Sequence, residues 1–193
     1  MLKNKDDIKA WLDKYKINNY TINDDLTVDV KGSVDLYGKS LSSIPVQFGT
    51  VTNSFDCGDN ELTTFKGCPK KVGKIFIGVD NNVTSLENGP EEIGHDYYIS
   101  NNPLVNLQHG PKKIGGDFLC RQVPLKNLHD INSEFEGKLF YCGSIIEDFS
   151  QYYTSTSLDI SYQEFKAIKQ FIELNKKVPH KDNNDIQSSK RKI

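Results

Sequence analysis

The chain has 193 residues, of which 36% are hydrophobic and 26% are charged, and its formal net charge at pH 7 is −2. The segment from residue 175 onward holds six basic and two acidic residues, which leaves a net charge of −6 for the rest of the chain. This length fits one domain with a continuous core, and an acidic body argues against a main surface that binds nucleic acid.

Residues 1–32 are expected to cap the N-terminal end of the fold. An amphipathic helix is predicted by four residues at helical spacing: Ile8, Trp11, Leu12 and Tyr15. Val28 and Val30 then alternate with polar residues, as in a strand. The pair Lys31-Gly32 is expected to form a two-residue hairpin into the first strand of the next segment. No apolar run of signal-peptide or transmembrane length occurs in residues 1–20, so we expect a cytoplasmic protein without a membrane partner.

Residues 33–160 contain six copies of a 21-residue unit with five apolar positions. These inward columns are Val34, Phe55, Phe76, Tyr97, Phe118 and Leu139; Leu36, Cys57, Gly78, Ile99, Cys120 and Tyr141; Leu41, Leu62, Val83, Leu104, Leu125 and Ile146; Ile44, Phe65, Leu86, Leu107, Leu128 and Phe149; and Val51, Val72, Ile93, Ile114 and Phe135. A unit this short cannot bury five side chains alone. We therefore expect a repeat solenoid with a parallel β-sheet on its concave face and extended or turn segments on its convex side.

Polar columns of the same period mark the corners of the unit. Asn60, Asn81 and Asn102 are expected to bond the backbones of adjoining units through their amides. Lysine pairs at 70–71 and 112–113 lie one period on either side of the glutamate pair at 91–92, so ion pairs are expected between neighbouring units.

Residues 161–178 are expected to form a C-terminal capping helix. Ser161 and Glu164 fit a capping box, and an apolar stripe follows at helical spacing: Phe165, Ile168, Phe171 and Ile172. Residues 179–193 lack an apolar period and are expected to form a disordered basic tail.

The outward position of the repeat strand carries large apolar side chains in four successive units. We call Ile77, Tyr98, Leu119 and Phe140 the stripe. A contiguous apolar patch of this kind is typical of a protein interface, with a polar rim formed here by His95, Asp96, Asp117 and Arg121. Tyr98, Phe140 and Arg121 are the expected anchors, because aromatic and arginine side chains dominate hot spots. The alternatives are that the C-terminal helix or tail of this chain covers the stripe, or that the stripe only reflects the strand propensity of these residues.

The segment Phe55-x-Cys57-x-x-Asn60-x-Leu62-x-x-Phe65 resembles the leucine-rich repeat pattern, and the short period is similar to that of bacterial-type leucine-rich repeat proteins of bacteriophages and bacteria. The resemblance covers residues 8–150. It implies a leucine-rich-repeat solenoid, and by analogy a phage protein that acts in the host cytoplasm.

Motifs of catalysis and metal binding are missing from the sequence. The four cysteines (Cys57, Cys68, Cys120 and Cys142) lack zinc-type spacing and are expected to be free thiols. Asp35 and Asp56 stand on neighbouring units but have no partner base. We therefore expect no catalytic residue, no metal and no cofactor.

The function expected from these observations is binding of a macromolecular partner without catalysis. The partner would be a protein, such as a host enzyme or defence factor that is inhibited or redirected, and a monomeric state is favoured. Two alternatives stay open. One is a self-associating structural component of a virion or appendage, and the other is a glycan-binding protein.

Overall fold

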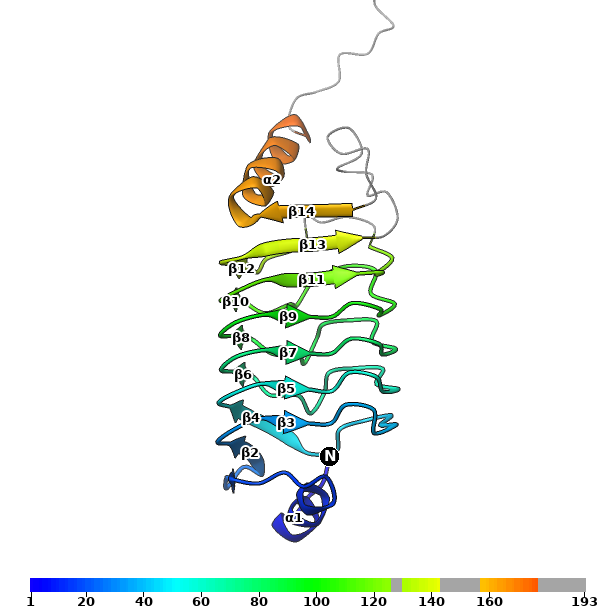
Figure 1. The fold of residues 1–193 in the computed structure, drawn as a ribbon, viewed down its shortest axis with the longest axis vertical. Coiled ribbons are helices and arrows are strands. Elements are labelled where there is room, and N and C mark those ends of the chain that lie inside the picture. Colours follow the sequence, from blue (N-terminus) through cyan, green and yellow to red (C-terminus); the bar gives the residue numbers. More distant parts are fainter. Residues whose placement is uncertain (126–129, 143–156, 177–193) are drawn as a thin grey trace, which may run out of the picture.

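The chain folds into a stack of rungs that is closed by a helix at each end (Figure 1). The structure, a computed structural model, describes residues 1–125, 130–142 and 157–176. Its elements in chain order are α1 (Lys5–Lys14), β1 (Tyr20–Ile22), β2 (Thr27–Val30), β3 (Val34–Asp35), β4 (Gln47–Val51), β5 (Phe55–Asp56), β6 (Lys71–Val72), β7 (Phe76–Ile77), β8 (Glu92–Ile93), β9 (Tyr97–Tyr98), β10 (Lys113–Ile114), β11 (Phe118–Arg121), β12 (Glu134–Phe135), β13 (Lys138–Cys142), β14 (Ser157–Ser161) and α2 (Tyr162–Lys176).

The predicted repeat solenoid is confirmed, but it has two β-sheets, in each of which the strands of successive rungs pair in parallel. The β3–β14 sheet has the order β14-β13-β11-β9-β7-β5-β3, and the β1–β12 sheet has the order β1-β2-β4-β6-β8-β10-β12. The second sheet contains the fifth inward column, where the sequence predicted only turns or extended segments. Its strands pair readily because β-branched residues such as Val72 and Ile93 favour pleated structure, and because Lys71 and Glu92 are opposite charges in register.

The expected hairpin at Lys31-Gly32 is wrong. Strand β2 pairs antiparallel with β1 and parallel with β4, and the chain then crosses at Gly32 to the other sheet, where β3 begins. Val30 pairs with Val51, one period later, so β2 is an additional member of the fifth inward column. The predicted helix is confirmed as α1, whose Ile8 and Leu12 are buried.

The inward columns form the core as predicted, since all their described members are buried. Leu128, Ile146 and Phe149 lie outside the described residues. Aromatic rings from successive rungs are in contact along the stack, with centroids 5.2 to 6.4 Å apart: Phe48, Phe55, Phe65, Phe76, Tyr97, Phe118 and Phe135. Trp11 of α1 and Phe165 of α2 contact the two ends of this series. The core is therefore continuous from one capping helix to the other.

The predicted asparagine series bonds each rung to the next. The amide nitrogen of Asn81 donates to the carbonyl oxygens of Cys57 and Val79, both at 3.0 Å, and its oxygen accepts the N–H of Leu62 at 2.9 Å. Asn60 and Asn102 repeat this pattern one rung to either side. These buried side chains satisfy backbone groups that the turn leaves without strand partners.

A second repeating feature was not predicted, and it directly precedes these asparagines. One residue of each rung has a left-handed backbone, with φ between 52° and 61°: Gly38, Asp59, Asp80, Asn101 and Gln122. Glycine, Asn and Asp tolerate this conformation better than other residues. The run Gly-Asp-Asp-Asn at a 21-residue spacing was a readable signal for it.

The C-terminal cap has the predicted helix and one additional strand. Residues 157–160, which the sequence assigned to the repeats, belong to β14, which pairs antiparallel with β13. The predicted capping box closes the start of α2, where Ser161 N donates to Glu164 Oε2 at 2.8 Å and Glu164 N to Ser161 Oγ at 3.3 Å. Helix α2 then packs Tyr162 and Phe165 on Phe135 at the end of the stack. Residues 177–193 lie outside the described residues.

Replacing Asn81 by Ala is expected to lower the free energy of unfolding by about 1–3 kcal/mol. The buried Leu62 N–H would lose its acceptor, at a typical cost of about 1–3 kcal/mol, whereas the Cys57 and Val79 carbonyl oxygens keep the Asn60 amide and the Asp59 N–H as donors. Urea unfolding measures this change. Asn82→Ala is the matched control because Asn82 is exposed, and a control loss as large as that of Asn81→Ala would contradict the role of the buried amide.

Replacing Tyr97 by Phe is expected to stabilise the protein by about 1 kcal/mol. The Tyr97 hydroxyl is buried in the aromatic series and, among the described residues, is without a hydrogen-bond partner, so its removal relieves a desolvation cost. Thermal unfolding measures the effect. Tyr141→Phe serves as the comparison because the Tyr141 hydroxyl donates to Val123 O at 3.4 Å, and it should give no such gain.

Candidate functional site

The stripe lies on the outer face of the β3–β14 sheet, whose strands are stacked through the middle of Figure 1. Cross-strand register brings the four side chains together in sequence, from Ile77 to Tyr98, Leu119 and Phe140. Each is half-buried by its neighbours. Neither end of the stripe continues as an apolar column, because Asp56 precedes Ile77 and Asp159 follows Phe140 in the same register.

The apolar surface is wider than the stripe at its N-terminal end. Ile75 and Val79 alternate with Ile77 and are also half-buried, so three outward residues of this rung are apolar. Tyr37, two rungs below Val79, has half of its surface exposed (50%). Sequence reasoning followed only the middle column and missed these residues, although the alternation Ile75-Ile77-Val79 was a readable signal.

The two rim aspartates bond the backbone of the following rung. Asp96 Oδ1 accepts the N–H of Asp117 at 2.8 Å, and Asp117 Oδ1 accepts the N–H of Lys138 at 2.8 Å. Burial raises the pKa of Asp96, but hydrogen bonds from Asp117 N–H, the Tyr98 hydroxyl and His95 outweigh it, so the pKa is lowered. Both side chains therefore hold rungs together at the border of the stripe.

Two of the predicted anchors are held in place by their neighbours. The Tyr98 hydroxyl donates to Asp96 Oδ2 at 2.8 Å, and burial, together with this bond and the nearby acidic charges, raises the pKa of Tyr98 to about 12. The Arg121 guanidinium lies over the Phe140 ring at 5.4 Å. The exposed His95 contacts Asp96 through Nδ1 at 2.9 Å. All eight predicted site residues thus lie on or beside this face.

The outer face of the other sheet is charged instead of apolar. Lys71 pairs with Glu92 at 3.0 Å, and Lys113 pairs with Glu136 at 3.5 Å. A groove of about 520 Å³ runs beside these residues over glycines such as Gly94, where a β-carbon would collide with the Gly73 carbonyl oxygen. The glycines are therefore explained by close approach of the rungs.

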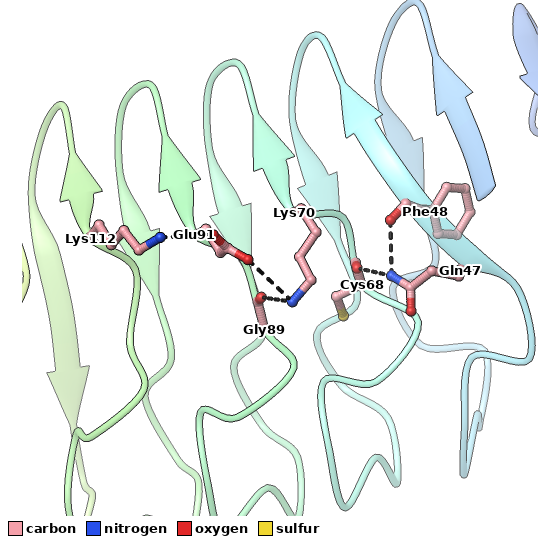
Figure 2. Close-up of polar contacts among 7 residues, drawn as sticks. All are labelled: Gln47, Phe48, Cys68, Lys70, Gly89, Glu91 and Lys112. Carbon is pink, nitrogen blue, oxygen red and sulfur yellow. Dashed lines mark hydrogen bonds and ion pairs between the residues drawn. The ribbon is translucent and has the colours of Figure 1, made fainter. Parts of the chain in front are cut away.

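The predicted alternation of charge between rungs is confirmed at the neighbouring corner (Figure 2). Glu91 accepts from Lys112 at 3.1 Å and contacts Lys70 at 3.8 Å, and Lys70 also donates to Gly89 O at 3.4 Å. The hydrogen bond from Lys112 and the charges of both lysines hold the pKa of Glu91 below its usual value. Gln47 bridges two further carbonyls in the same view. These contacts explain the charges as links between rungs.

The four cysteines are free thiols, of which Cys57, Cys68 and Cys120 are buried and Cys142 is half-buried. Cys57 and Cys120 lie in the core, where burial raises the pKa of each thiol. Asp35 and Asp56 each accept a backbone N–H two residues further on, from Tyr37 and Gly58. In the described ranges, no three His, Cys, Asp or Glu side chains gather as a candidate metal site, and neither helix is long and apolar enough to cross a bilayer.

Comparison of the chain with protein families, with curated proteins and with solved structures finds no match.

Replacing Asp56 by Asn is expected to stabilise the protein at pH 7 but hardly at pH 3. Burial raises the pKa of Asp56, the Gly58 N–H partly offsets this, and the Asp35 charge adds to it. The folded state therefore loses stability as the pH rises from the unfolded pKa of about 3.9 through the higher folded value. Asn keeps an acceptor for the Gly58 N–H and removes the charge.

Urea unfolding at the two pH values checks this. Glu134→Gln, an exposed site on the other sheet, gives the comparison. A gain for Asp56→Asn that is equal at both pH values would contradict the explanation.

Proposed function

We propose that this protein is a non-catalytic binding module that holds a protein partner on the outer face of its β3–β14 sheet. The single observation that supports this is the contrast between its two sheets. One outer face carries Ile77, Tyr98, Leu119 and Phe140 in register, whereas the other carries alternating charges that pair with each other. A contiguous apolar surface with a polar rim is characteristic of interfaces.

The anchors on this face are suited to binding because they are already fixed. Four side chains about 4.8 Å apart span about 14 Å. Tyr98 is held by Asp96, and Phe140 is held by Arg121, so little side-chain freedom remains to be lost when a partner binds. Tyrosine and arginine are also common at the energetic centres of interfaces.

The kind of partner follows from the resemblance to leucine-rich repeat proteins of bacteriophages and bacteria. By this analogy, the partner is a host protein in the cytoplasm, an enzyme or a defence factor, which the module inhibits or redirects. A protein partner also agrees with the acidic character of the chain outside its basic end.

The double variant Ile77→Lys/Leu119→Lys is expected to lose partner binding while keeping the fold. Neither wild-type side chain makes a polar contact, and a lysine stem covers similar apolar area while placing a charge in the interface. A loss of about 2 kcal/mol or more, roughly a 30-fold weaker affinity, is expected for central anchors. Co-purification of the tagged protein from a bacterial lysate, with mass spectrometry of the captured proteins, provides the measurement.

Val105→Lys is the matched control, because Val105 is an exposed apolar residue (43%) outside the sheet faces. Unchanged recovery of the captured proteins by the double variant, with circular dichroism showing an intact fold, would contradict the proposal. Sedimentation over a range of concentrations tests the self-associating alternative. A wild-type oligomer that the double variant abolishes would identify the partner as a second copy of the chain. A glycan array tests the third possibility, although the Tyr98 hydroxyl is already bonded to Asp96.

A further inference from the structure

The outer face of the β3–β14 sheet has uncompensated negative charge at its N-terminal end. Asp35 and Asp56 occupy the two register positions that precede Ile77. Each uses one oxygen to accept a backbone N–H, at 3.0 and 2.9 Å. Within the described residues neither aspartate belongs to an ion pair. Like charges opposite each other in a sheet are destabilising, so this end of the face favours a cation.

An aromatic ring lies beside these carboxylates. A β-carbon placed on Gly58 would lie 3.2 Å from Val79 Cγ2, 3.3 Å from Asp56 Oδ1 and 3.4 Å from Tyr37 Cδ2. The three side chains therefore converge over Gly58 and join the acidic end to the apolar surface. A half-exposed tyrosine ring next to carboxylates is suited to a Lys or Arg side chain, which interacts with both.

A second copy of this chain whose stripe overlaps the first completely does not supply the missing cation. In a two-fold pair with these faces together, an axis along the stack puts Asp56 opposite Asp56 of the other copy. An axis along the strands through the middle of the stripe puts Asp56 opposite Asp159, which is already paired with Lys138 at 3.2 Å. Phosphates of nucleic acids and anionic lipid headgroups are repelled by the same carboxylates. These observations favour a different protein as the partner.

We propose that this face binds a segment of a partner protein in which a Lys or Arg side chain contacts Asp35, Asp56 and the Tyr37 ring, and neighbouring apolar side chains lie along the stripe. This inference rests on the proposed function and adds the chemistry of the partner. The distance from Asp56 to Phe140 is four rungs, about 19 Å, which an extended segment of about six residues spans. The cation and the apolar residues can therefore belong to one short peptide.

A displayed library of random 12-residue peptides, selected on the full chain at low salt, tests this inference. Enriched peptides are expected to carry Lys or Arg within about six residues of two or more large apolar residues. Synthetic copies are then measured by fluorescence anisotropy. Affinity should fall about tenfold in Asp35→Asn/Asp56→Asn, which keeps both acceptors for the backbone, and this difference should shrink in high salt.

The control Glu87→Gln/Glu134→Gln changes the net charge equally at two exposed acids elsewhere, and its affinity should stay within twofold of the wild type. Ile77→Lys/Leu119→Lys should abolish binding. Two results would overturn the inference: enrichment of peptides without a cation, or equal affinities for the wild type and Asp35→Asn/Asp56→Asn. The proposed function would still stand if binding requires Leu119. Selected peptides that ignore Ile77 and Leu119 would contradict both. If no peptide binds better to the wild type than to the stripe variant, the inference fails, and the lysate experiment decides the proposed function separately.

Discussion

In-register stacking at a fixed 21-residue period is the constraint on which this structure depends. Backbone N–H groups of each rung donate to the rung after it in one sheet and to the rung before it in the other, and each side chain lies beside its equivalents one period away. A feature that fits one rung must therefore fit its neighbours. The buried asparagines and the left-handed residues before them are the clearest examples, because each group satisfies or permits the same turn in successive copies. An insertion of one residue would disrupt the turn and both sheets together.

The same constraint explains why the two outer faces differ. Side chains in register are about 4.8 Å apart, so identical charges repel and opposite charges attract. On the β1–β12 sheet the result is alternation, as in the pair of Lys71 and Glu92. On the β3–β14 sheet the middle column from Ile77 to Phe140 avoids this repulsion with apolar residues, which gain contact area from their apolar neighbours. This solution leaves an apolar surface that stacking alone covers only partly.

The period made the core predictable, because burial follows directly from the position of a residue in the unit. Strand pairing was less predictable. The hairpin at Lys31-Gly32 was inferred from local turn chemistry, although Val30 lies one period before Val51 and so belongs to the second sheet. The roles of the rim depended on side-chain direction, which spacing does not encode. Asp96 was predicted as a polar contact for a partner, whereas the structure shows that it also holds the N–H of Asp117.

Asp35 and Asp56 depart from the alternation of charge that links the rungs at the lysine and glutamate corner. At that corner Glu91 pairs with Lys70 and Lys112, whereas these two carboxylates are adjacent in register and lack a cation in the described structure. The electrostatic cost of this arrangement is reflected in the pKa of Asp56, which burial and the Asp35 charge both raise. In natural proteins, local interactions usually agree with the global fold. Places where they disagree concentrate at functional sites. The position of this departure, at the end of the stripe and beside the Tyr37 ring, therefore links the acidic residues to the binding face.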